Sequence, residues 1–334
     1  MERRQFLKTS TAMGSALALG LENSFSKTKS PIADTSFHYG AARSRVVIAH
    51  SKFVRRADRT ISIVQLARLL DTAIEKLFNK PANRAWSALF SARDIVGLKV
   101  NCLAGKNLST HPEIVDHVIE CLRSAGVKKQ NIFIFDRRQR DLLRAGYKIS
   151  RARDQIQCLG NDQVGFSEQL FEYGSVASQL SNILLHCTAV INLPILKDHG
   201  IVGLSCAMKN LFGVINNPNK YHMDIGDPFV ADVNMLPPIR DKIRLTICDA
   251  LTAQYEGGPP FMPEWSWPMN SLLAATDMVA MDRIAWDIIE EKRAEKGKQS
   301  LENAGRKPTY IDTAADSEHG LGTSDPDKIE VIRV

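Results

Sequence analysis

Cysteine is scarce in this chain. Six cysteines occur in 334 residues, and no two of them are spaced as Cys-x-x-Cys. That spacing is typical of structural zinc and iron–sulfur sites, so the sequence excludes a site of that type. Apolar neighbours indicate that the cysteines are small core residues, and their even number leaves disulfides open for an exported chain.

The sequence also has few aromatic residues and only a small excess of positive charge. Phe, Trp and Tyr make up 7% of the sequence, and half of the formal net charge of +6 falls in the first thirty residues. No basic stretch is interleaved with aromatic side chains, as a base-stacking surface requires. These deficits argue against nucleic acid as a partner.

Long hydrophobic runs are missing as well. Beyond the N-terminus, no segment reaches the roughly eighteen apolar residues that a membrane-spanning helix needs. We therefore expect no stable membrane span once the N-terminal segment is removed. The chain is nevertheless 44% apolar, enough for a core that needs neither metal nor disulfide.

The N-terminus has the layout of an export signal. A charged start, ERRQFLK, precedes the mild apolar run TAMGSALALGL, which is too short to span a bilayer. Arg3 and Arg4, followed by Gln-Phe-Leu-Lys, resemble the twin-arginine motif of bacterial proteins that fold before crossing the membrane. We expect residues 1–35 to be a signal peptide with a linker, the twin-arginine export machinery to be a partner, and the protein to be periplasmic or otherwise exported.

The remaining sequence alternates short β-rich runs with helical periodicity. This alternation predicts an α/β fold, a mainly parallel sheet flanked by helices, in one domain over residues 45–334. A capping box, Thr110 with Glu113, is expected to start the second of the helices. Strands are predicted at 45–49, 94–101, 131–135, 187–196, 242–248 and 328–334, and helices at 61–78, 112–124 and 277–293.

Two stretches have no regular period. Residues 216–240 contain NNPNKYHMDIGDP and two further prolines, and residues 255–268 are rich in Gly, Pro and Trp. Both are predicted to be long irregular loops, the second of them a lid or an interface.

Polar residues follow the predicted strands. Ligands of open α/β sheets gather outside the carboxyl ends of the strands, so these positions are informative. Asp136 and Asp249 fit either a site or the cap of a turn. Lys99 lies inside an apolar strand, where a lysine must snorkel, pair with a carboxylate or face a cavity. The remaining strand ends carry His50, Asn101, Asn192, Lys197 and His199.

The segment NLPILKDHGIVGLSCAMKNLFG, residues 192–213, has the densest cluster of such residues. We expect a helix to begin at its two glycines, Gly200 and Gly203, with free backbone N–H groups at its start. Lys197, His199 and Lys209 would then surround an anion such as a carboxylate or a phosphate. The predicted buried stripe of this helix is Ile201, Leu204, Met208 and Leu211.

Several blocks together resemble the DUF362 family, a bacterial and archaeal domain of unknown function. They are VGLKVN, STHPEIVDHVIECLRSAG, FDRR, INLPILKDHGIVGLSCAMKNLFGVI, ICDA with EGGP, and AATDMVAMDRIAWDII. Some members resemble redox proteins because they carry ferredoxin-like cysteine clusters, which this chain lacks. The resemblance implies site residues at Lys99, Asn101, His111, Lys197, His199, Lys209, Asn210 and His222.

These residues support two classes of function, and a third possibility is an exported protein in which they form only a structural polar network. The first is an enzyme, redox-linked in one version, that acts on a small anionic substrate in a Lys/His pocket. His199 and His222 would transfer protons, because imidazole titrates near neutral pH. The second is a non-catalytic protein that binds a metal or ligand through His111, His199 and His222, with Asp198 or Asp224. The sequence names no cofactor; the substrate-binding set is Lys99, Asn101, His111, Asn192, Lys197, Lys209 and Asn210.

Overall fold

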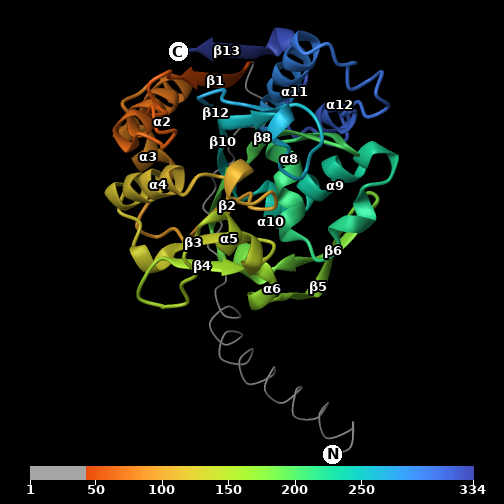
Figure 1. Ribbon diagram of the computed structural model, residues 1–334. Helices are drawn as coiled ribbons and strands as arrows, with labels where there is room; N and C mark the ends of the chain where they lie inside the picture. Colours follow the sequence, from red (N-terminus) through yellow and green to blue (C-terminus); the bar gives the residue numbers. More distant parts are fainter. Residues whose placement is uncertain (1–42) are drawn as a thin grey trace, which may run out of the picture.

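The computed structural model describes residues 43–334, so the predicted export signal lies outside the described residues. A single eleven-stranded sheet runs through the molecule in the order β13-β1-β12-β10-β7-β2-β3-β4 (Figure 1). In addition, β8 and β11 pair with β10, and β9 pairs with β8. Its strands are β1 (Ser44–His50), β2 (Val96–Val100), β3 (Ile132–Asp136), β4 (Gln157–Gly160), β7 (Ala189–Leu193), β8 (Ile195–His199), β9 (Gly203–Ser205), β10 (Ile243–Gln254), β11 (Ser266–Trp267), β12 (Ser271–Ala275) and β13 (Ile329–Arg333).

The part of the sheet that carries the site is parallel. Strands β10, β7, β2, β3 and β4 all run the same way, whereas β12 is antiparallel to both of its neighbours. A separate antiparallel hairpin, β5 (Phe166–Tyr173) with β6 (Val176–Ser181), lies beside the sheet. The carboxyl ends of five neighbouring strands therefore meet at one edge, where ligands of such sheets bind.

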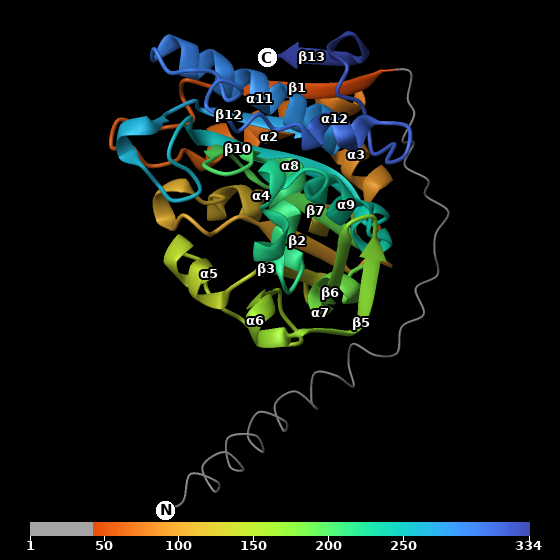
Figure 2. The same cartoon turned by 90° about the vertical axis from the view of Figure 1, so that its right-hand side faces the viewer.

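Helices cover both faces of the sheet, because successive side chains of a strand point to opposite sides. In β1, Val46 and Ile48 belong to one hydrophobic core, and Val47 and Ala49 belong to the other. Helices α2 to α4 cover one face, and α8 to α12 cover the other (Figures 1 and 2). The helices are α2 (Ile63–Phe78), α3 (Ala82–Leu89), α4 (Pro112–Ser124), α5 (Gln139–Ala145), α6 (Asn161–Val164), α7 (Asn182–His186), α8 (Ala207–Asn210), α9 (Phe229–Met235), α10 (Pro237–Arg240), α11 (Met278–Glu295) and α12 (Tyr310–Ala315).

The predicted α/β class is confirmed, and α4 has the predicted bounds of residues 112–124. The capping box before α4 is wrong. The N-cap residue is His111, without a side-chain cap, because the Thr110 hydroxyl donates to the carbonyl of Leu193 (2.7 Å) instead. Thr110 therefore ties the start of α4 to the end of β7. Within residues 43–334, no helix is both long enough and apolar enough to cross a membrane.

The predicted strand at 187–196 is two strands separated by Pro194. β7 pairs with β2 and with the first half of β10, whereas β8 pairs with the second half of β10. The carbonyl of Pro194 accepts the N–H of Asp249 (2.9 Å), which holds the two strands at the break. β10 thus continues to Gln254, beyond the predicted end at residue 248.

One of the two predicted irregular loops contains regular structure. Residues 229–240 form α9 and α10, so the prediction of a loop over 216–240 is wrong in its second half. Nearly every residue of α9 is buried, Asp232 and Asn234 included, so its sequence shows no amphipathic period. Residues 255–268 are irregular apart from one short turn and the two residues of β11.

The helix predicted to begin at Gly200 is also wrong. Residues 195–205 form a hairpin in which β8 pairs with β9, and the short helix α8 begins only at Ala207. Ile201, predicted to be buried, lies at the tip of this hairpin with 52% of its surface exposed. Gly203 has a φ of +79° and little room for a side chain, which suits a tight turn.

Asp277 joins three parts of the fold at the start of α11. Its carboxylate accepts the N–H groups of Val279 and Ala280 as the N-cap, and it also accepts the hydroxyl of Ser44 and the N–H of Thr323. The Asp277 side chain is therefore hydrogen-bonded to strand β1, to helix α11 and to the segment before β13.

We predict that Asp277→Ala lowers the free energy of unfolding by at least about 2 kcal/mol, because an N-cap and two further contacts are lost together. Asp277→Asn, which keeps one acceptor oxygen, should cost less, and Ser44→Ala should cost less again. Urea unfolding followed by circular dichroism measures all three variants. A cost for Asp277→Ala no larger than that for Ser44→Ala would contradict this role.

Candidate functional site

Eight of the nine side chains singled out from the sequence gather at the carboxyl edge of the parallel strands. β2 and its carboxyl end, β8, and α8 supply most of them, and His222 comes from the irregular segment before α9. Among the described residues, His111 hydrogen-bonds to none of these side chains: its imidazole Nδ1 pairs with the carboxylate of Asp249 (2.6 Å). The eight clustered residues are Lys99, Asn101, Asn192, Lys197, His199, Lys209, Asn210 and His222.

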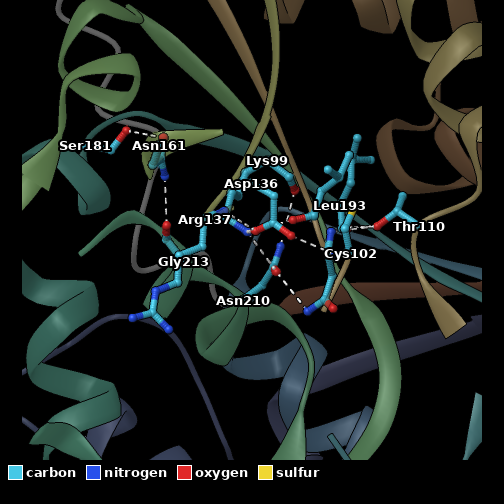
Figure 3. A network of polar contacts seen from close by, with 12 residues as sticks. Lys99, Cys102, Thr110, Asp136, Arg137, Asn161, Ser181, Leu193, Asn210 and Gly213 are labelled. Atoms are coloured by element: carbon cyan, nitrogen blue, oxygen red, sulfur yellow. Dashed lines mark hydrogen bonds and ion pairs between the residues drawn. The ribbon is translucent and has the colours of Figure 1, made fainter. Parts of the chain in front are cut away.

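Lys99 is paired with a carboxylate. Its Nζ donates to Asp136 Oδ1 (2.8 Å), to the carbonyl of Val100 (2.6 Å) and to Asn210 Oδ1 (3.1 Å). Figure 3 shows this arrangement, in which a lysine from β2 and an aspartate from β3 point toward one another. All three donors of the ammonium are used, so Lys99 supports the site and has no donor left for a ligand.

Two asparagines extend this support. Asn210 accepts from Lys99 and from Asn101 Nδ2 (3.1 Å), and it donates to Asn192 Oδ1 (2.8 Å) and to the carbonyl of Lys99 (3.2 Å). Asn192 in turn donates to the carbonyl of Ala207 (2.8 Å). Each amide is buried and bonded on both of its polar atoms, as stable buried polar groups are. This network fixes α8 against the ends of β2 and β7.

Lys197 and His199 project from the same face of β8, because they are two residues apart in a strand. Lys197 Nζ donates to the carbonyl of Pro259 (3.2 Å) and lies 3.4 Å from Asn101 Oδ1. Burial lowers the pKa of Lys197 to about 8. Lys197 is therefore largely charged at neutral pH, although it is only 1% exposed.

Asp198 points to the other face of β8 and anchors the hairpin. Its carboxylate pairs with the guanidinium of Arg306 (2.7 Å) and accepts the N–H of Gly258 (2.8 Å). A Cβ on Gly258 would lie 2.1 Å from the carbonyl oxygen of Asp198, so only glycine fits at this approach. These contacts on the opposite face of β8 fix the strand, and so the positions of Lys197 and His199.

Lys209 has an unusual environment for a buried lysine. Its Nζ lies 3.1 Å from His222 Nε2 and 3.5 Å from the centre of the Phe212 ring. Among the described residues, no carboxylate forms an ion pair with Lys209 or with Lys197. Burial lowers the pKa of Lys209 well below its ordinary value, and the charges of Arg137 and Lys197 lower it further.

Both histidines of the cluster are neutral near pH 7. Burial, with the charge of Lys209, lowers the pKa of His199 to about 2 and that of His222 to about 4. The two rings stack with centroids 5.5 Å apart. His222 Nδ1 contacts the carbonyl of Pro218 (3.0 Å), an acceptor, so the proton of the neutral ring sits on Nδ1 and the lone pair of Nε2 faces Lys209.

Sequence reasoning missed Arg137 and Gly213 as residues of the site. The sequence allows Asp136 to be either a site residue or a turn cap, and in the structure Asp136 is the partner of Lys99. Arg137 follows it and adds positive charge to the surroundings of Lys209 and His222. A Cβ on Gly213 would lie 2.8 Å from Lys99 Nζ, so Gly213 leaves the space that the ammonium occupies. The FDRR block was the available signal for the two charges.

The predicted metal ligands are not brought together. His111 is bonded to Asp249, Asp198 is bonded to Arg306, and His222 faces an amine. Metal ligands must point their lone pairs at one centre, and these side chains do not. The arrangement at the edge of the sheet is instead a cluster of amines and neutral imidazoles. It packs against the Lys99–Asp136 pair, in which the two charges cancel. Such a cluster favours an anion.

The fold and this cluster define an α/β protein with a buried Lys/His site at the carboxyl edge of a parallel sheet. The family model described as "Domain of unknown function (DUF362)" matches residues 96–287, which is more than half of the chain. The chain belongs to this family. The match includes every residue of the cluster.

A curated relative is a protein of Synechocystis sp. whose printed name is thylakoid-associated protein. It is 28% identical to this chain over 208 residues, which are 59% of this chain and 63% of the relative. The chain thus spans less than two thirds of the length of this relative.

We predict that the Lys99–Asp136 pair behaves as one unit in folding. Lys99→Met leaves a buried carboxylate and Asp136→Asn leaves a buried ammonium, so each should lower the free energy of unfolding by about 3–5 kcal/mol. The double variant should cost clearly less than the sum of the two, because it leaves no unpaired charge. Urea unfolding of the four proteins measures the coupling.

A matched control for this cycle is the Arg45–Glu330 pair, whose side chains are 32% and 43% exposed. Glu330→Gln should change the free energy of unfolding by less than about 1 kcal/mol. Additive costs for Lys99→Met and Asp136→Asn would show that the two side chains are not coupled.

Proposed function

We propose that this protein is an enzyme that binds a small anionic substrate, a carboxylate or a phosphate, between Lys197 and Lys209. The observation that carries the proposal is the environment of Lys209: a buried amine with an imidazole and a ring beside it and no carboxylate partner. Burying an ionisable amine without a counter-charge is costly, and fold stability alone gives no reason to retain it. Strongly perturbed groups of this kind cluster at functional sites.

An anion supplies the charge that the site lacks. The support residues are already bonded to one another, whereas Lys197 and Lys209 each contact only neutral groups at hydrogen-bond distance. Arg137 adds positive charge nearby. A bound carboxylate or phosphate would raise the pKa of Lys209 toward its ordinary value, so binding would draw a proton into the site.

The neighbouring imidazole gives this proton a route. His222 Nε2 carries a lone pair directed at Lys209 Nζ, and the two atoms are 3.1 Å apart. A proton can therefore pass between the amine and the imidazole without either side chain moving far. His199, stacked on His222, is neutral near pH 7 and adds no charge of its own. In this proposal Lys197 holds the substrate, and the Lys209–His222 pair transfers the proton.

We predict that sulfate, a divalent anion whose charge is constant from pH 6 to 9, raises the melting temperature of the protein at neutral pH. Lys197→Met and Lys209→Met should each weaken sulfate binding at least about tenfold, because one charge-assisted contact is lost. His222→Gln should retain sulfate binding. Binding by the wild type should weaken between pH 7 and pH 9, because Lys197, whose pKa is about 8, loses its proton in that range.

Lys242→Met is the matched control. Lys242 is a partly buried lysine at the opposite end of β10, where it donates to the carbonyls of Leu184 and Leu185. This variant should keep the full response to sulfate, and chloride at equal ionic strength should reproduce none of it. Equal sulfate responses in the wild type, Lys197→Met and Lys209→Met would overturn the proposed binding site.

We propose further that the protein is exported through the twin-arginine pathway. The proposal rests on Arg3 and Arg4, on the Phe-Leu-Lys that follows them at residues 6–8 and on the short apolar run after them. A site that must be assembled from β2, β8 and α8 before it can bind a ligand suits a route that carries folded proteins.

The expected result is that replacing both Arg3 and Arg4 by Lys retains the protein in the cytoplasm of a bacterial host with this pathway. Lys8→Arg, which preserves the charge outside the arginine pair, should be exported like the wild type. Cell fractionation with immunoblotting measures both. Export of the double-lysine variant at the wild-type level would refute the proposal.

A further inference from the structure

A second cluster of potential ligands lies on the opposite side of the sheet from α8, where α2 packs near α4. His117 and Cys121 are four residues apart in α4, so they lie on one face of that helix. Asp71 of α2 faces them. His117 Nε2 lies 3.1 Å from Asp71 Oδ1 and 3.7 Å from Cys121 Sγ, and the three ligand atoms all lie within 4.8 Å of one another.

These separations match the edges of a metal tetrahedron. With bonds of about 2.0–2.3 Å to nitrogen, oxygen and sulfur, the ligand atoms of a tetrahedral zinc ion lie about 3.3–3.8 Å apart. The two separations from His117 Nε2 are close to this range. A small shift of the exposed Asp71 side chain would complete the geometry.

The chemistry of the donors agrees with this geometry. One thiol, one imidazole and one carboxylate form a set that zinc accepts, and Ca²⁺ and Mg²⁺ do not favour sulfur. Glu120 Oε2 lies 3.5 Å from His117 Nδ1, the ring nitrogen that would face away from the metal. A carboxylate in that position orients the imidazole of many zinc sites.

The cluster is also open to solvent. All six cysteines are free and lie among the described residues, and Cys121 is the one that is not buried. The side chain of Asp71 is 42% exposed and that of His117 is 14% exposed. An ion can therefore reach the three ligands from solution, and a water molecule can fill the fourth position.

We propose that Asp71, His117 and Cys121 form a binding site for a divalent transition-metal ion of the zinc type between α2 and α4. On binding, the Cys121 thiol gives up one proton to solvent and the His117 imidazolium, which Asp71 holds protonated, gives up another from Nε2. The metal–sulfur and metal–nitrogen bonds then form with no change of oxidation state. The site is separate from the Lys/His cluster, with which it shares no residue and no hydrogen bond.

Zinc titration of the full-length, reduced and metal-stripped protein, in competition with a chromophoric chelator, tests this site. The expected result is one Zn²⁺ per chain. Cys121→Ala and Asp71→Asn should each lower the affinity at least about a hundredfold, and Glu120→Gln by about tenfold. His50→Gln, a change at a histidine outside the cluster, should leave the affinity as in the wild type. Co²⁺ should give a thiolate charge-transfer band that Cys121→Ala abolishes.

Two results would overturn the site: the absence of stoichiometric Zn²⁺ binding, or an affinity that is unchanged in Cys121→Ala and Asp71→Asn. In either case His117 and Asp71 form an ion pair between helices and nothing more. Asp71 is partly exposed, so its variant is expected to fold and keeps the test decisive.

Discussion

The buried ion pair between Lys99 and Asp136 determines the rest of the site. A charge that is 1% exposed needs a partner, and the partner comes from the neighbouring strand at the point where both strands end. Asp136 also accepts the N–H groups of Cys102 and Arg137, so the pair fixes the backbone just beyond β2 and β3. Asn210 binds to Lys99 and thereby holds α8 in position.

Two other buried amines, Lys197 and Lys209, lie beside the Lys99–Asp136 pair and have no carboxylate partner among the described residues. The polar atoms of Lys99, Asn192 and Asn210 are bonded to protein, whereas Lys209 faces only an imidazole and an aromatic ring. The contrast separates residues whose polar groups are bonded within the fold from Lys209, which we propose contacts a ligand. The protein bears the cost of a buried amine at one place, and that place is where open α/β sheets bind their ligands.

The sequence predicted the fold class, strands β1, β2, β3, β7, β10 and β13 and the bounds of α4, because these depend on local periodicity. It also indicated which polar residues meet, since strand ends converge in a parallel sheet. It failed where long-range contacts override local patterns. Thr110 binds β7 instead of capping α4, and α9 is buried on all sides and so has no visible period. The hairpin at Gly203 could not be told from a helix start, because glycine serves both.

The hairpin that carries Lys197 and His199 depends on a residue outside the family match. Arg306 holds Asp198 from behind, and it lies nineteen positions after the end of the matched region at residue 287. The family match therefore ends before a residue that holds the hairpin of this chain in place. A shortened version ending at residue 287 would keep Lys197 and His199 yet leave the buried carboxylate of Asp198 without its cation, so the position of the hairpin would no longer be fixed.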